Sequence, residues 1–119
     1  MELGPNQTLW LEALRSGLYA QGTGYLNHTD KFCCLGVACE IFTDPLDLDT
    51  DLDGLVTVYE GRRSCAPEAI VDHLGLRGEL GESSTGCPSL AQLNDEGTLH
   101  PEIADIITAD PAVYFRSPR

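Results

Sequence analysis

The sharpest chemical signal of the sequence lies between Asp49 and Glu60. This stretch fits the calcium-binding loop of EF-hands, in which side-chain and main-chain oxygens surround the ion. Gly54 occupies the position of the sharp turn, and the carboxylate of Glu60 would close the site. The pattern therefore makes Ca²⁺ the candidate cofactor, with ligands from Asp49, Asp51, Asp53, Leu55, Thr57 and Glu60.

The residues around this loop favour a different interpretation. An EF-hand loop lies between two helices, whereas Pro45 interrupts any helix before the loop and Gly61 follows directly after it. The stretch Leu55–Tyr59 alternates β-branched residues, which predicts a strand. We therefore expect an aspartate-rich solvated segment that meets the pattern by composition, with calcium binding as an alternative.

Cysteine and histidine provide the other reactive side chains. Cys33, Cys34 and Cys39 lie in one apolar run, and their spacing does not match the Cys-x2-Cys pairs of zinc sites. We expect them to fill the core, because cysteine is among the most buried residue types. A zinc site, the alternative, would draw further ligands from His28, Cys65 and Cys87. None of the three histidines has a catalytic signature around it, so we expect a non-catalytic protein.

Two further features suggest ligand binding more weakly. Gly22-x-Gly24 lacks the third glycine and the Lys-Ser/Thr of a phosphate-binding loop. A nucleotide-binding protein is a second alternative, and it requires that basic and aromatic side chains gather around one cavity. The side chains in question are Arg15, Arg62 and Arg63 with Tyr19 and Tyr25.

The charge of the chain restricts its partners. It has 19 acidic and 7 basic residues and a net charge of −12, which disfavours nucleic acid and anionic membranes and favours a basic protein partner. No apolar run approaches the ~20 residues that a membrane span needs. The first residues do not resemble a signal peptide, and an odd number of cysteines fits reduced thiols, so we expect a cytoplasmic protein. The oligomeric state is not indicated.

The elements that position these residues are predicted to form one α+β domain over residues 1–119, with four to five short helices packed on a small antiparallel sheet or hairpin. Helices are expected from Asn6 to Gly17, Phe32 to Phe42, Pro67 to Leu74, Pro88 to Asn94, and from Thr98 onward. Strands are expected around Tyr19–Leu26, with a bend or bulge at Gly22 or Gly24, and around Leu55–Tyr59. The remaining segments are an acidic loop over 43–54, a flexible loop over 77–87 and a loose tail over 110–119, with docking of Val113, Tyr114 and Phe115 as the alternative for the tail.

Capping residues and apolar spacing refine these helices. Asn6, Asp30 and Thr98 are the expected N-cap residues. The run Phe32–Phe42 is expected to be the buried central helix, in which Gly36 is tolerable if another backbone packs closely against it. The side chains expected to face the core include Leu9, Trp10, Leu99, Ile103, Ile106 and Ile107.

Several motifs along the chain carry a resemblance to a known family. They are Gln21-Gly22-x-Gly24, Phe32-Cys33-Cys34-Leu35-Gly36-Val37-x-Cys39 and Leu93-Asn94-Asp95-x-Gly97, together with the segments around Trp10, Pro67 and Ile103. With these motifs the chain resembles small uncharacterised proteins of tailed bacteriophages and prophages, many from actinobacterial hosts. The resemblance runs from about Trp10 to Ile107 and implies a phage origin and a cytosolic site of action. It implies no activity.

These observations lead to one main functional expectation. We expect a small acidic phage protein that binds and inhibits a host factor, such as an antiviral-defence component of the CRISPR type. The alternatives are a protein that sequesters a nucleotide signal and a calcium-stabilised binding module.

Overall fold

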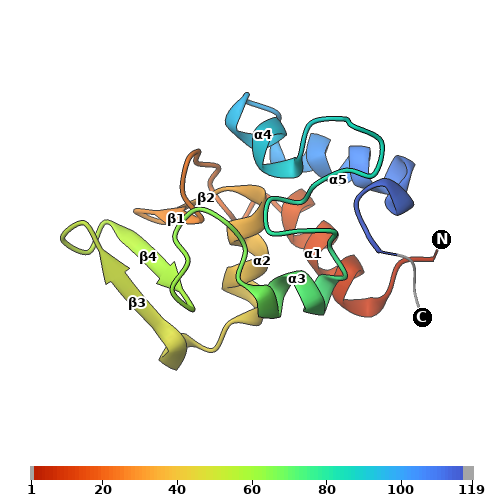
Figure 1. Cartoon of the computed structure of the whole chain (residues 1–119). Helices are drawn as coiled ribbons and strands as arrows, with labels where there is room; N and C mark the ends of the chain where they lie inside the picture. The colour runs from red at the N-terminus through yellow and green to blue at the C-terminus, as the bar shows by residue number, and fades with distance from the viewer. Residues whose placement is uncertain (1, 117–119) are drawn as a thin grey trace.

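The computed structural model describes residues 2–116, and within them it contains five α-helices and a four-stranded antiparallel sheet, which confirms the predicted α+β class. The helices are α1 (Pro5–Arg15), α2 (Cys34–Phe42), α3 (Glu68–Leu74), α4 (Leu90–Asp95) and α5 (His100–Ala109). The strands are β1 (Asn27–His28), β2 (Lys31–Phe32), β3 (Leu48–Asp51) and β4 (Val56–Tyr59), and two short 3-10 helices are η1 (Pro45–Asp47) and η2 (Pro111–Val113). The helices gather in one body, and the β3–β4 hairpin extends away from it (Figure 1).

Helix α2 is the buried central helix, as predicted. Its residues from Cys34 to Cys39 are all buried. It begins later than expected because Lys31 and Phe32 pair with β1 instead. The predicted cap Asp30 is wrong: Cys33 is the N-cap, and its Sγ accepts the Gly36 N–H at 3.3 Å. Asp30 instead lies in the tight turn between β1 and β2, at a φ of 61°.

Gly36 allows the close approach that the sequence suggested. A Cβ atom built at this position would lie 1.7 Å from the carbonyl oxygen of Leu26. No side chain fits there, so the missing Cβ lets the chain before β1 pack directly on α2.

Helix α1 packs against α2 through the buried ring of Trp10, whose Nε1–H donates to the Cys34 carbonyl at 2.9 Å. The predicted cap Asn6 is wrong, because α1 starts at Pro5 and its N-cap is Gly4, two residues before the predicted cap. Pro5 is suited to this first position because its missing N–H would have no partner there. Leu9 was expected to face the core and is exposed.

The segment expected to be a loose tail is docked as far as it is described. Tyr114 and Phe115 are buried, and Phe115 meets Trp10 edge to face with ring centroids 6.2 Å apart. Arg116 adds a backbone hydrogen bond of 2.6 Å from its N–H to the carbonyl of Gly75. Residues 117–119 of the predicted tail lie outside the described residues.

The sheet has the order β2-β1-β4-β3, so β3 forms one edge. The strand predicted over Tyr19–Leu26 is wrong. Only Gln21 of that segment forms an isolated bridge, with Phe32, and Gly24 turns the chain at a φ of 80°. The predicted strand over Leu55–Tyr59 is confirmed as β4, whereas the expected acidic loop contains η1 and strand β3.

The C-terminal half follows its predicted helices with small shifts. Helix α3 ends at Leu74, with Gly75 at a φ of 72°, and no helix or strand lies in the expected loop over 77–87. Helix α5 is capped at Leu99 instead of Thr98. Leu99 and Ile106 are exposed, contrary to expectation, while Ile103 and Ile107 are buried as predicted. None of the described helices has the length and apolar character needed to cross a membrane.

Candidate protein-binding surface

The segment of residues 44–60, called the acidic hairpin below, comprises η1, β3, a tight turn and β4. The two strands pair antiparallel from Leu48 opposite Tyr59 to Asp51 opposite Val56. The turn between them uses three positive φ values at Leu52, Asp53 and Gly54, of 52°, 58° and 85°. Asp53 and Gly54 accept such values readily, whereas a positive φ is uncommon for a leucine such as Leu52. The turn folds the aspartate-rich strand back along the apolar one.

The inner strand of this hairpin anchors it to the body. Val56 and Tyr59 are fully buried, and the Tyr59 hydroxyl donates to a carboxylate oxygen of Glu40 at 2.9 Å. The Asn27 side chain donates to the same hydroxyl at 3.2 Å. Burial, reinforced by the bond to Glu40, raises the pKa of Tyr59 well above its usual range, so the hydroxyl keeps its proton. The hairpin is therefore held at β4, and β3 forms its outer edge.

The outer part of the acidic hairpin is strongly negative. Residues 44–60 contain six acidic side chains and no Lys or Arg. Among them, Asp51 pairs with Arg63, while Asp44, Asp47, Asp49, Asp53 and Glu60 take part in none of the ion pairs of the described residues. A negative surface of this kind attracts basic proteins and speeds their association.

Apolar side chains accompany these charges. Leu46 is 91% exposed, Leu52 is 50% exposed and Leu55 is 48% exposed. Single exposed leucines are common on protein surfaces, but here three of them lie on one short projecting segment among carboxylates. Apolar contacts framed by charge are typical of protein interfaces. The leucines were not singled out from the sequence, although the alternation of Leu and Asp over residues 46–53 was visible there.

A cavity of about 230 Å³ lies at the base of the acidic hairpin. The rings of Phe42 and His73 meet in it with centroids 4.6 Å apart. Its polar wall is negative, because three carboxylates contribute to it. The lining residues are Phe42, Thr43, Asp44, Asp47, Glu60, Ala69, Ile70 and His73. A ring beside carboxylates suits the methylene stem and cationic head of a Lys or Arg side chain.

The predicted calcium ligands are spread along this hairpin and do not form a cage. Asp53 and Leu55 lie at the turn and Glu60 at the opposite end of β4. Asp49 and Asp51 accept the N–H groups of Thr50 and Leu52, while Thr57 is opposite Thr50 in the ladder. Within residues 2–116 no three His, Cys, Asp or Glu side chains gather closely enough to hold a metal ion. The segment forms two strands and a turn in place of the helix–loop–helix geometry of an EF-hand. Calcium binding stays a prediction, and calorimetric titration with Ca²⁺ tests it.

Three of the cysteine side chains fill the core, as expected. Cys33, Cys34 and Cys39 are buried, and burial raises the pKa of Cys33 to about 11 and that of Cys34 well above its ordinary value. The thiols therefore stay protonated and unreactive at neutral pH. Cys65 is half-buried and Cys87 is exposed, in separate loops.

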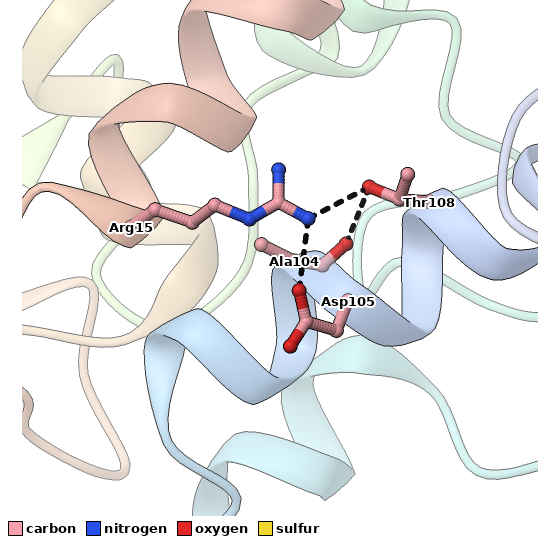
Figure 2. Close-up of polar contacts among 4 residues, drawn as sticks. All are labelled: Arg15, Ala104, Asp105 and Thr108. Carbon is pink, nitrogen blue, oxygen red and sulfur yellow. Dashed lines mark hydrogen bonds and ion pairs between the residues drawn. The ribbon is translucent and has the colours of Figure 1, made fainter.

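The arginines proposed to gather around a nucleotide lie in separate ion pairs. Arg15 on α1 reaches α5, where its Nη2 donates to Asp105 at 2.9 Å and to Thr108 at 3.1 Å (Figure 2). The Thr108 hydroxyl in turn donates to the Ala104 carbonyl at 2.7 Å, so this cluster fixes one helix on the other (Figure 2).

The remaining two arginines of that set are also engaged. Arg62 pairs with Glu79 at 2.9 Å, and Arg63 pairs with Asp51 on the hairpin. A shallow surface hollow of about 410 Å³ includes Tyr25, stacked on His28 with centroids 5.7 Å apart, but none of these arginines lines it. The basic and aromatic side chains do not converge as the nucleotide-binding alternative requires.

The sequence motifs meet in a second region, the motif junction, defined by Gln21, Asn94 and His100. The Asn94 side chain accepts the N–H of Cys34 at 3.1 Å and donates to the Gly22 carbonyl at 2.8 Å. Gln21 donates to Asn94 and to the Thr98 carbonyl, and accepts the N–H of His100 at 2.9 Å. Every buried side-chain polar atom of the described residues has a partner, so the junction organises the fold.

Comparison with known families and proteins gives one match. A family model described as "Domain of unknown function (DUF8296)" matches residues 6–111, a range that includes both the motif junction and the acidic hairpin. No curated protein and no solved structure matches the chain.

Proposed function

We propose that this chain, which belongs to the DUF8296 family of domains of unknown function, is a non-catalytic binding protein whose acidic hairpin docks on a basic surface of a partner protein. The observation that carries the proposal is the projection of the hairpin from the helical body (Figure 1). The hairpin combines carboxylates that form no ion pair within the described residues with the exposed leucines Leu46, Leu52 and Leu55. Three of its carboxylates line the cavity at its base. A basic surface with small apolar pockets is the complement of this arrangement.

The partner we propose is a host factor of a phage-infected cell, and the protein would act in the host cytoplasm. The resemblance of the sequence motifs to tailed-phage proteins supports this choice. Components of CRISPR-type defence systems handle nucleic acid and therefore carry basic surfaces. A strongly acidic protein with a net charge of −12 can occupy such a surface in place of nucleic acid and inhibit its owner.

A pair of charge variants tests the proposal. In the hairpin variant, Asp44, Asp47, Asp49 and Asp53 become Asn, which keeps the side-chain shape and the hydrogen bonds of η1 and β3. In the matched control, the exposed residues Glu2, Glu12, Glu68 and Asp110 become the corresponding amides. Both variants lose four negative charges, so a difference in partner binding between them is due to the position of the charges on the hairpin.

The measurement is recovery of host proteins on immobilised protein, followed by the affinity of each recovered protein in solution and by phage plating on the host. We expect the wild type and the control to bind a common partner, and the hairpin variant to bind it at least about tenfold more weakly. Equal recovery by both variants would overturn the proposal, because the hairpin charges would then play no part.

A further inference from the structure

We propose that the acidic hairpin holds its partner by strand addition, in which an extended partner segment with Lys or Arg at alternate positions pairs with the edge strand β3. The inference rests on the proposed function, since it specifies how the same surface binds. It follows from the hydrogen-bonding groups, the side-chain alternation and the charge of β3.

The backbone of β3 is open on its outer side. Within the described sheet, β3 pairs with β4 alone. Tyr59 of β4 exchanges both of its backbone hydrogen bonds with Arg62, at 2.8 and 2.9 Å, so its ladder partner Leu48 is not bonded to it. Antiparallel pairs alternate between bonded and non-bonded, so Leu48 and Thr50 direct their N–H and C=O groups away from β4.

The hydrogen bond of Thr50 supports this assignment independently. Its N–H is bonded to Oδ1 of the neighbouring Asp49 at 2.8 Å, and not to β4. An incoming strand replaces this local bond with its own carbonyl and frees the Asp49 carboxylate to face a cation. Leu48 and Thr50 together offer the row of donors and acceptors that an added strand requires.

The side chains of β3 select the sequence of the added strand. Successive residues point to opposite faces, so Asp49 and Asp51 share one face, and Leu48 and Thr50 share the other. A strand laid beside β3 places every second residue next to these aspartates, where Lys or Arg is favoured. Asp51 already pairs with Arg63, so Asp49 contributes more to the selection.

The same charges argue against a second copy of this chain as the occupant. Two β3 strands placed edge to edge would bring aspartates against aspartates, and like charges opposite each other destabilise a strand pair. Acidic edges are a common protection against self-association. The edge strand β3 therefore disfavours pairing with a second copy of itself and favours pairing with a basic strand.

Synthetic peptides with the wild-type protein provide the first test. The probe is a labelled peptide of about eight residues in which Lys alternates with Val, and its control has the same residues with the lysines grouped together. Fluorescence anisotropy is expected to show at least tenfold tighter binding of the alternating peptide. Alternate residues of a strand direct their N–H groups to opposite edges. N-methylation of the peptide residues whose N–H groups face β3 should abolish binding, and N-methylation of the residues between them should leave binding unchanged. Equal binding of the alternating and grouped peptides would overturn the inference.

Variants at Thr50 provide the second test. Thr50→Pro removes the outward N–H without touching the ladder to β4, and proline is tolerated at such edge positions. Thr50→Val keeps the N–H and the β-branched shape. We expect Thr50→Pro to lose binding of the alternating peptide at least tenfold and Thr50→Val to retain it. If both variants bind like the wild type, the partner does not pair with β3.

The two proposals fail in different ways. If charge attracts the partner without strand addition, the hairpin amide variant loses the host partner while Thr50→Pro keeps it and the peptides bind regardless of residue order. If the acidic hairpin is not the binding surface, the amide variant and its control recover the same host proteins. The peptide experiments use the folded wild-type chain, so their result does not depend on the stability of any variant.

Discussion

The motif junction and the acidic hairpin both contain many polar side chains, but they use them in opposite ways. In the junction, Gln21, Asn94 and His100 bond to other parts of the same chain, and three distant segments meet there. In the hairpin, Asp51 has an ion-pair partner within residues 2–116, and the other five carboxylates have none. A satisfied polar network specifies a fold, whereas charged groups left to solvent are free to meet a partner. The difference separates the residues that build this domain from those that we propose to act.

The largest expected effect belongs to the packed region. Gly36→Ala places a Cβ atom 1.7 Å from the Leu26 carbonyl oxygen, so α2 and the chain before β1 must move apart. We expect the free energy of unfolding to fall by more than about 3 kcal/mol, because overpacking against a backbone cannot be relieved by a rotamer change. Urea unfolding monitored by Trp10 fluorescence measures it.

Gly17→Ala is the control for that experiment. A Cβ at Gly17 meets nothing within 4 Å, so its cost is the positive φ of 75° alone, about 1 kcal/mol. Equal losses for the two variants would show that α2 does not pack against the chain before β1 as described.

The next effect concerns the motif junction itself. Asn94→Ala leaves the buried N–H of Cys34 and the carbonyl of Gly22 without their partner and removes a bond to Gln21. We expect a loss of about 3 kcal/mol in the free energy of unfolding, since each orphaned buried group costs roughly 1–3 kcal/mol. Gln92→Ala on the same helix removes only an exposed contact with Glu96 and should cost less than about 0.5 kcal/mol. If both variants lost a similar free energy of unfolding, the motif junction would not have the organising role that we assign to it.

Sequence patterns predicted the elements whose signals are local. The run around α2, the Pro67 and Gly75 boundaries of α3 and the alternation in β4 each depend on adjacent residues, and each was confirmed. The strand expected over Tyr19–Leu26 failed because the chain turns at Gly24, with a φ of 80°, so that the pairing with Phe32 ends at a single bridge from Gln21. The docking of Phe115 on Trp10 joins opposite ends of the chain, which no local pattern reports.

The candidate surface was predicted in part. Its aspartates were evident as a cluster, and Asp53-Gly54 between two alternating stretches is a hairpin signal that was available. The position of β3 at the sheet edge and the cavity between Phe42 and His73 depend on how α2, α3 and the hairpin come together. Those features required the three-dimensional structure.

A smaller effect should appear as a pH dependence of folding stability that arises from His100 in the motif junction. His100 is buried with Nε2 3.0 Å from the Phe32 carbonyl, and burial lowers its pKa from the ordinary value of 6.5. The unfolded chain therefore takes up a proton at a higher pH than the folded one, so stability is lost as the pH falls below 6.5. The urea midpoint should drop between pH 7 and pH 5.5, and less so in His100→Gln. An equal drop in both proteins would assign the dependence to other groups.

The smallest effect on stability is expected in the hairpin, and it is the sharpest test of the contrast between the two regions. The carboxylates of Asp44, Asp47, Asp49 and Asp53 form no ion pairs within the described residues, and Asn keeps the hydrogen bonds that the side chains of Asp44 and Asp49 accept from the backbone. Converting all four to Asn should therefore change the free energy of unfolding by less than about 1 kcal/mol, or raise it slightly through reduced repulsion. Urea unfolding of this variant beside its four-charge control gives the value. A loss as large as that of Asn94→Ala would mean that these charges hold the fold together, and the hairpin would then resemble the junction. Unchanged stability with lost partner binding would separate the two regions by function as well as by structure.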